Sequence, residues 1–308
     1  MNREKLLAYL QLFRLPNVFT AISNILMGYL FTKYIPGEPL TGVWFTYLIS
    51  LMLSSSCLYI GGMVLNDVYD FDVDSQDRPD RPLPSGRINL AWAKKLGFGL
   101  LAVGVLLAAF PGIGSFAPRS AIIAVLLAMA IYLYDSVAKQ TAAAPILMGS
   151  CRTLNILLGM SCAGALKTDQ LLIALGIGIY VAGITWFARC EAKTSNRNML
   201  TFGVAVMLVG ITVLSMWPWF SERSTLLVAK WVWPTLLVLL VTSVVRRCTM
   251  AISNPEPKNV QNAVKHSIFS LIVLDAAVVL ATVGPYPALV VLALLIPTMF
   301  LGKWIYST

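Results

Sequence analysis

Ten long apolar runs, separated by short polar segments, make up most of the chain. They lie near residues 17–34, 43–66, 95–113, 119–135, 145–166, 170–188, 198–217, 226–245, 266–283 and 287–305. A helix of about 20 residues crosses a hydrocarbon core of about 30 Å, and a segment inside lipid must satisfy its own backbone hydrogen bonds. The runs are too long and too uniformly apolar for barrel strands. The pattern therefore predicts ten transmembrane helices.

The composition agrees with a membrane protein. Of the 308 residues, 58% are hydrophobic and only 12% are charged, and the mean hydropathy is +0.77. Such a chain has too little polar surface for a water-soluble globule. No linker is long enough to separate soluble domains, and no removable signal peptide is apparent. We therefore expect one membrane domain over residues 1–308.

Lysine and arginine are concentrated in alternate loops. If the N-terminus is cytoplasmic, 17 of the 23 basic residues fall on the cytoplasmic side, 5 fall outside, and Arg152 lies within a helix. The positive-inside rule then predicts that both termini are cytoplasmic. The net charge of +9 is explained by topology and lipid headgroups, so we expect no nucleic-acid partner. The expected location is a bacterial plasma membrane.

The acidic residues are collected directly after the second apolar run. Six of the fourteen carboxylates lie between Asp67 and Asp80. If a helix continues past Asn66, a turn of about 3.6 residues puts Asp67, Asp70 and Asp74 on one face. Three carboxylates at a membrane boundary repel one another unless a cation joins them. Mg²⁺ commonly takes one or two carboxylates together with substrate phosphate oxygens. The alternative is a solvated acidic loop.

The loop after the acidic residues favours a phosphate ligand. It reads RPDRPLPSG over residues 78–86. Three prolines stiffen this loop, and the guanidinium groups of Arg78 and Arg81 bind phosphate in a fork geometry. Carboxylates that suit Mg²⁺, followed by two arginines, indicate a diphosphate.

These motifs resemble those of the UbiA superfamily of intramembrane prenyltransferases. The RLPN run at residues 14–17 is similar to the family's RPxN signature, and the likeness covers roughly residues 10–283. The family's NDxxDxxxD motif and its RPLPSG ending are matched by Asn66, Asp67, Asp70, Asp74 and residues 81–86.

The resemblance implies an all-α polytopic bundle of about nine core transmembrane helices around a central cavity, with residues 287–305 as an extra tenth helix. A polyprenyl diphosphate and Mg²⁺ would bind at its cytoplasmic end. Ionisation would leave an allylic carbocation that alkylates an aromatic or other lipophilic acceptor. Metal and cationic side chains stabilise the charge on the leaving diphosphate, and an apolar cavity keeps water from the carbocation.

The residues and the resemblance together predict the site. The expected members are Asp67, Asp70, Lys139 and Arg152 for catalysis, Asn66, Arg78, Arg81, Tyr134, Asn155, Arg189 and Glu191 for substrate binding, and Asp67, Asp70, Asp74 and Glu191 for the metal.

Two family motifs are altered in this chain. The YxxxK element is one residue longer, since Tyr134 and Lys139 are five apart and Asp135 and Lys139 have the i, i+4 spacing. Lys139 is still expected to contact diphosphate. The alternative is an interfacial tyrosine and a lysine that flanks the membrane.

The second altered motif is the family's DxxxD after the sixth helix. Its nearest counterpart is Glu191 and Ser195, so one acid is missing. Arg189, Lys193 and Arg197 recur every four residues and would form a basic helical face. That face could neutralise diphosphate directly, or it could meet lipid headgroups while Glu191 faces inward.

Charged residues within the apolar runs are a further signal. Arg152 and Asn155 share a face of the fifth helix, and intramembrane charge is expensive and usually faces a functional cavity. We expect these residues to contact the substrate. The alternative for Arg152 is a structural pairing with Asp275 or with a carbonyl. For Asp275 itself, a hydrogen bond between helices is the expected role.

Two classes of function remain open at this point. The strings YDSVAK, MGSCRTLNILLG and TWFARCEA are most similar to the EboC-like branch of the superfamily. The first class is a Mg²⁺-dependent prenyltransferase. The second is a non-catalytic descendant that binds an isoprenoid or small metabolite or helps to export it. The chain has no P-loop, no Rossmann glycine pattern and no Cys/His metal set.

Overall fold

The computed structural model describes residues 3–33, 42–110, 118–162, 165–189, 196–221 and 232–304. Within these residues all of the regular secondary structure is helical. The elements are α1 (Arg3–Leu12), α2 (Leu15–Lys33), α3 (Gly42–Tyr69), α4 (Phe71–Asp77), α5 (Leu90–Ala109), α6 (Arg119–Leu133), the π-helical turn η2 (Tyr134–Ala138), α7 (Ala144–Gly159), α8 (Thr168–Ala188), α9 (Arg197–Phe220), α10 (Val232–Ser253), α11 (Pro257–Thr282), α12 (Pro285–Ala293) and α13 (Leu295–Trp304).

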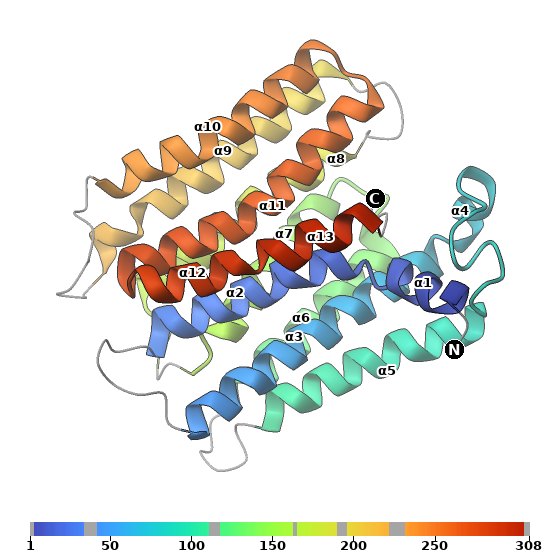
Figure 1. Ribbon diagram of the computed structural model, residues 1–308, viewed down its shortest axis with the longest axis horizontal. Helices are drawn as coiled ribbons and strands as arrows, with labels where there is room; N and C mark the ends of the chain where they lie inside the picture. The colour runs from blue at the N-terminus through green and yellow to red at the C-terminus, as the bar shows by residue number, and fades with distance from the viewer. Residues whose placement is uncertain are drawn as a thin grey trace.

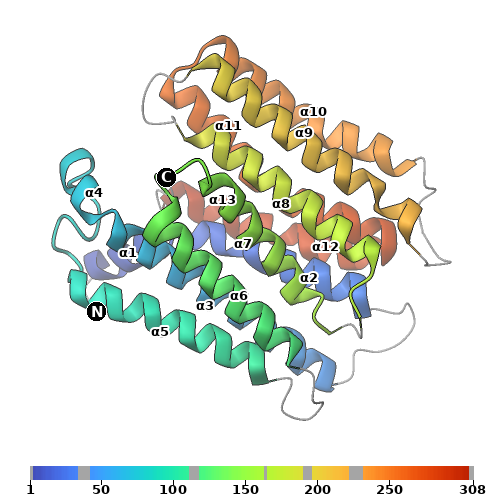
Figure 2. The same cartoon turned by 180° about the vertical axis from the view of Figure 1, so that it is seen from behind.

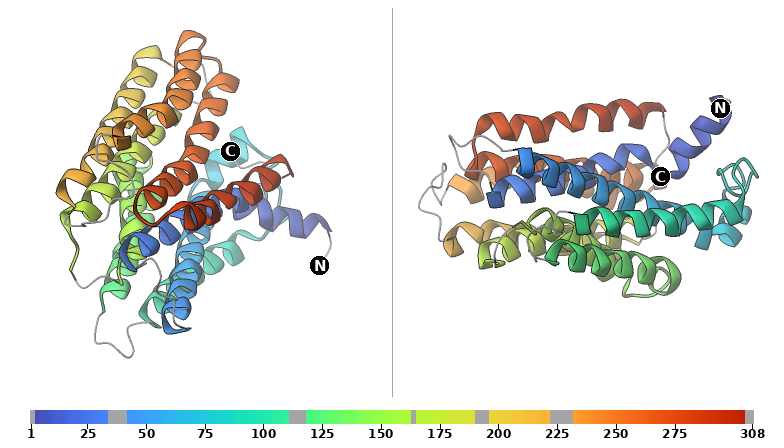
Figure 3. Two further views of the ribbon diagram at one scale, coloured as in Figure 1. Left: turned by 60° about the vertical axis from the view of Figure 1, so that its left-hand side comes forward. Right: turned by 90° about the horizontal axis from the view of Figure 1, so that it is seen from below.

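The long helices form a single bundle whose axes run in roughly the same direction (Figure 1). Helices α9 and α10 lie along one flank and α5 lies along the other, with α2, α7 and α11 between them (Figures 1 and 2). The short helices α1 and α4 both lie at the same end of the bundle (Figures 1 and 3). The elements that carry the acidic motif therefore gather at that end.

All ten predicted helices are present, but several boundaries differ from the prediction. The ninth was expected to begin at residue 266, whereas α11 begins at Pro257. Proline is favoured in the first turn of a helix, and the polar residues that follow it continue the helix beyond the apolar run. The tenth run is broken into α12 and α13 around Leu294. Pro297 lacks an N–H and its ring clashes with the carbonyl four residues earlier, which explains the break.

By length and composition alone, eight helical stretches of the described chain could cross a membrane. Helices α2 and α7 fall outside this set. Helix α2 carries the buried polar residues Thr20, Ser23 and Asn24. Helix α7 has only 16 residues and carries the buried Asn155 and the half-buried Arg152. The polar content of α2 and α7 thus belongs to the interior of the bundle.

Small residues let neighbouring helices approach closely. A Cβ atom added to Gly210 on α9 would lie 2.4 Å from the backbone nitrogen of Tyr180 on α8. Side-chain packing across apolar contacts is the main attraction between helices in lipid, and small residues allow it. The α8–α9 contact is one example of the packing that fixes the bundle around its cavity.

Candidate active site

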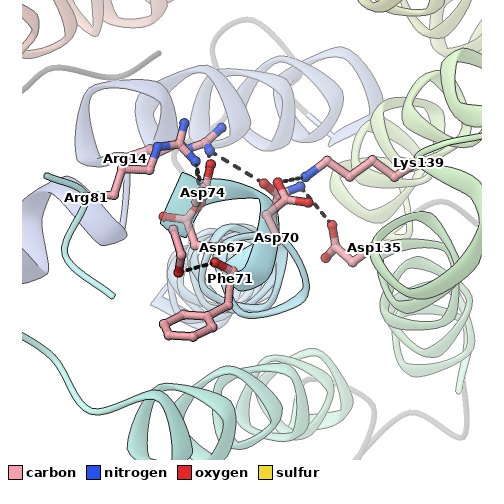
Figure 4. Close-up of polar contacts among 10 residues, drawn as sticks. Arg14, Asp67, Asp70, Phe71, Asp74, Arg81, Asp135 and Lys139 are labelled. Atoms are coloured by element: carbon pink, nitrogen blue, oxygen red, sulfur yellow. Dashed lines mark hydrogen bonds and ion pairs between the residues drawn. The ribbon is translucent and has the colours of Figure 1, made fainter. Parts of the chain in front are cut away.

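The acidic segment is helical across the boundary of the bundle. Helix α3 extends to Tyr69, and α4 follows after a single residue. The backbone N–H of Asp70 donates to the Asn66 carbonyl at 3.0 Å, and that of Asp74 donates to the Asp70 carbonyl at 2.8 Å. Helical phase is therefore kept. Asp67, Asp70 and Asp74 lie together in the view along α3, as the sequence spacing predicts (Figure 4).

Each of these three carboxylates is paired with a cation from another element. Arg14 Nη2 lies 3.0 Å from Asp67 Oδ1. Arg81 Nη1 lies 2.6 Å from Asp74 Oδ2 and 3.6 Å from Asp67 Oδ1. Lys139 pairs with Asp70. The side chains of Asp67 and Asp74 are only 6% and 7% exposed, so the cations offset charges that are largely removed from water.

Arg14 is a member of this cluster that the predicted site set did not include. It sits between α1 and α2 with a left-handed backbone φ of 44°, which is unusual for a residue other than glycine. Burial favours its neutral form, but the nearby carboxylate of Asp67 raises the pKa of Arg14 above its ordinary value. The available signal was its place in the RLPN run.

The π turn η2 explains the extra residue in the altered YxxxK element. The backbone N–H of Lys139 donates to the Tyr134 carbonyl at 3.0 Å, an i to i+5 bond. A π turn holds one more residue than an α turn. Tyr134 and Lys139 therefore occupy equivalent places in successive turns although five positions separate them. The π turn accounts physically for the longer spacing.

Asp135 lies within the segment between Tyr134 and Lys139 that is one residue longer than the family's spacing. Its Oδ1 accepts a hydrogen bond of 3.0 Å from Asn66 Nδ2. Arg14 and Arg81 lie on one side of the three motif carboxylates, and Lys139 and Asp135 lie on the other (Figure 4). The sequence drew attention to Asp135 only through its spacing from Lys139.

A mostly apolar cavity lies beside this cluster. Its polar lining comes from α3, η2 and α7, and its apolar lining includes Leu127, Ile131 and Met148. Tyr134, Arg152 and Asn155, all predicted to bind substrate or assist catalysis, are part of the wall. An interior of this kind suits an isoprenoid chain.

Arg152 is held by α2. Its guanidinium donates to the Thr20 carbonyl at 3.1 Å and to Asn24 Oδ1 at 2.7 Å. Asn24 Nδ2 in turn donates to Asp275 Oδ2 at 2.7 Å. Arg152 therefore makes the carbonyl contact considered as its structural role and also lines the cavity, and Asp275 makes the predicted bond between helices.

Asn155 is likewise bonded within the bundle. Its Oδ1 accepts from Ser55 Oγ at 2.6 Å, and its Nδ2 donates to the Ala21 carbonyl at 3.0 Å. Helices α2, α3 and α7 are joined through this one side chain. Because both ends of its amide are engaged, Asn155 presents a fixed surface to the cavity.

The remaining predicted residues form no ion pair with the motif carboxylates within the described ranges, or lie outside those ranges. Arg189 is exposed, donates to the Thr141 carbonyl at 3.0 Å and stacks 5.5 Å from the Trp186 ring centroid. Arg197 donates to the Ser253 carbonyl at 3.0 Å. Arg78 follows α4, and its backbone N–H donates to the Asp74 backbone carbonyl at 2.8 Å. Glu191, Lys193 and Ser195 lie outside the described residues.

The donor set has the chemistry that Mg²⁺ prefers. Carboxylate oxygens are hard ligands, and Mg²⁺ commonly completes its octahedron with substrate phosphate and water. Within the described ranges, no three His, Cys, Asp or Glu side chains are arranged so that they could hold a metal ion as they stand. For Asp67, Asp70 and Asp74 to hold Mg²⁺, their cationic partners would have to turn away and phosphate oxygens would have to supply the remaining ligands.

Comparison with known proteins decides the family. The model of the UbiA prenyltransferase family matches residues 21–269. The chain belongs to this family. The digeranylgeranylglyceryl phosphate synthase of Sulfurisphaera tokodaii is 35% identical over 133 residues, which are 43% of this chain and 44% of that protein. The synthase of Ignicoccus hospitalis is 32% identical over 161 residues, 52% of this chain and 48% of that protein. The match spans about half the length of these relatives.

Solved structures share the fold of this UbiA-family protein. A structure of digeranylgeranylglyceryl phosphate synthase superposes with a TM-score of 0.65 at 20% identity, covering 91% of this chain and 99% of that one. A UbiA homologue from Archaeoglobus fulgidus bound to GPP and Mg²⁺ gives 0.62 at 14% identity, covering 86% and 99%. At these identities the likeness establishes the fold alone, an all-helical polytopic membrane bundle.

Proposed function

We propose that this UbiA-family protein transfers a prenyl group from a polyprenyl diphosphate to a lipophilic acceptor, with Mg²⁺ as cofactor. The observation that carries the proposal is the juxtaposition of two buried carboxylates and one partly buried carboxylate, their three cations and an apolar cavity. Carboxylates and cations together suit a metal diphosphate, and the cavity suits its hydrocarbon tail. The Archaeoglobus fulgidus homologue binds GPP and Mg²⁺, which supports this pairing.

The chain's own residues would act by exchanging partners. Asp67, Asp70 and Asp74 would hold Mg²⁺, and Glu191 is proposed as a further ligand. Bound there, Mg²⁺ would neutralise charge that builds on the diphosphate as its bond to carbon breaks. Arg14, Arg81 and Lys139, released from the carboxylates, would donate to diphosphate oxygens.

The other predicted residues divide between the headgroup and the tail. Arg78 and Arg189 are proposed to attract the diphosphate from the rim of the site. Asn66 would orient it from the acidic side. Tyr134, Arg152 and Asn155 would contact the first prenyl carbons from the cavity wall, where exclusion of water protects a carbocation.

Location and acceptor are the finer parts of the proposal. The charge pattern supports a plasma membrane with both termini and the acidic site on the cytoplasmic side. The named relatives are archaeal, so the bacterial source and the EboC-like branch stay predictions. The name of those relatives refers to a glyceryl phosphate lipid, which supports a lipid acceptor for this chain.

The test is release of diphosphate from geranylgeranyl diphosphate by the purified protein, with and without Mg²⁺, beside the double variant Asp67→Asn/Asp70→Asn. We expect Mg²⁺-dependent release that the double variant loses by at least 100-fold. The matched control is Asp72→Asn, because Asp72 is an exposed carboxylate of the same segment. Tight Mg²⁺-dependent binding without release, even with membrane lipid extract added, would instead favour the non-catalytic binding or export function.

A further inference from the structure

The cavity wall contains a carboxylate oxygen with no partner. Asp135 is 7% exposed, and within the described chain its Oδ2 has no hydrogen-bond partner while its Oδ1 accepts from Asn66. Buried polar atoms are nearly always bonded, because an unmade hydrogen bond inside a protein is costly. An orphaned oxygen on a residue of the cavity wall therefore indicates a ligand group that would complete it after a small movement of the side chain.

The local backbone is built to place this carboxylate. Asp135 is the second residue of η2, the five-residue π turn that lengthens the Tyr134 to Lys139 spacing. Single π turns are rare in proteins as a whole, and those that occur are often found at functional sites. Lys139 pairs with Asp70 and Tyr134 lines the cavity, so the inserted residue adds a carboxylate without removing either of them.

Three other polar side chains of the wall are already engaged. Asn155 is bonded through both ends of its amide, Ser55 donates to Asn155, and Arg152 donates to α2. Asp135 Oδ2 differs from these groups because its capacity is unused. An ionised carboxylate oxygen only accepts hydrogen bonds, so the complementary ligand group is a donor such as a hydroxyl.

We propose that Asp135 binds the nucleophilic hydroxyl of the prenyl acceptor, which makes a lipid alcohol the substrate class; this inference rests on the proposed prenyl transfer. The bond between the allylic carbon and diphosphate breaks, and its electron pair leaves with the diphosphate. The hydroxyl oxygen forms the new bond to that carbon. Its proton passes to Asp135 Oδ2, so that the products are an ether and diphosphate.

The position of Asp135 fits this role. The carbon that reacts is attached to the diphosphate, which the motif carboxylates and their cations would hold. Asp135 is bonded to Asn66, the residue directly before Asp67, and it faces the cavity that would receive the hydrocarbon. An acceptor hydroxyl on Asp135 would therefore lie between the diphosphate site and the apolar interior, where the two substrates must meet.

The experiment compares two probes that differ in one hydrogen-bond donor: geranylgeranylglyceryl phosphate, which has one free hydroxyl, and its methyl ether at that hydroxyl. Affinity is measured with Mg²⁺ and a non-ionisable thio analogue of geranylgeranyl diphosphate present. We expect the wild-type protein to bind the alcohol at least tenfold more tightly than the ether. The variant Asp135→Asn should prefer the alcohol by no more than twofold.

Asp169→Asn is the matched control. Asp169 is also a buried carboxylate, but both of its oxygens are bonded, to the backbone N–H of Gln170 and to Ser221. We expect this variant to keep the wild-type preference. Equal affinity of the wild-type protein for the two probes would overturn the inference, whether or not the Asp135 variant folds, and so would an unchanged preference in Asp135→Asn.

The inference can fail separately from the proposed function. Mg²⁺-dependent binding of the thio analogue alone reports on the diphosphate site. If that binding is retained and the alcohol preference is absent, the role of Asp135 is wrong and the diphosphate site stands. If the analogue does not bind, the proposed function itself is contradicted.

Discussion

Arg14 and Asp67 are 53 positions apart in the sequence and 3.0 Å apart in the structure. Their pairing illustrates how the site works at the scale of single residues. Each acid of the motif is paired with a cationic side chain from the α1–α2 junction, from the loop after α4 or from the end of η2. In the proposed function, the same cations would become available to diphosphate when a metal takes their carboxylates. The charges of the site would then stay balanced, and neither set would be left unpaired.

Replacing Arg14 with glutamine tests this exchange. We expect Arg14→Gln to weaken Mg²⁺-dependent binding of geranylgeranyl diphosphate by roughly 10- to 100-fold, because a charge-assisted hydrogen bond contributes about 1.5–3 kcal/mol. The affinity for geranylgeranyl diphosphate is measured by calorimetric titration of the detergent-purified protein. The control is Arg87→Gln, since Arg87 is exposed and bonds to Ser85 and to the Asp80 carbonyl. An Arg14 variant that binds within twofold of wild type would contradict the exchange.

At the scale of elements, the π turn has the clearest functional consequence. A one-residue insertion in an α-helix would normally rotate every later side chain by about 100°. Here η2 absorbs the extra residue, so that Tyr134 lines the cavity and Lys139 reaches Asp70. Hydrophobic periodicity could not predict the π turn, because a segment of five residues is too short to tell the period of a π turn from that of an α turn.

Deleting Val137, an exposed residue of η2, tests the π turn. We expect the shortened segment to close as an α turn and to keep the Tyr134–Lys139 register. Binding of geranylgeranyl diphosphate should then stay within about threefold of wild type. Inserting an alanine after Val137 should move Lys139 away from Asp70 and weaken binding by about 10-fold or more, on the charge-assisted hydrogen-bond scale. Equal binding by the two variants would contradict the assigned register.

For the whole molecule, the ten-helix architecture could be predicted from the sequence because each segment must satisfy its backbone within lipid on its own. The acidic face could be predicted for a similar reason, since the spacing of Asp67, Asp70 and Asp74 is local. The pairing of Arg14 with Asp67, the Asp135 oxygen that lacks a partner among the described residues and the bond from Arg152 to Asn24 could not be predicted, because each depends on how distant helices are placed. The break at Leu294 has a local cause in Pro297. It was not predicted because residues 287–305 form one continuous apolar run.

The central claim, that the end of α3 and α4 holds a metal diphosphate above the cavity, is tested most directly by locating the metal. The measurement is anomalous diffraction from crystals of the protein grown with Mn²⁺ in place of Mg²⁺ and with the thio analogue of geranylgeranyl diphosphate. We predict an anomalous peak within about 2.5 Å of carboxylate oxygens of Asp67 and Asp70, with Arg14 or Lys139 turned toward the diphosphate. A diphosphate bound elsewhere, or a peak with the Arg14–Asp67 and Lys139–Asp70 pairs intact, would contradict the claim.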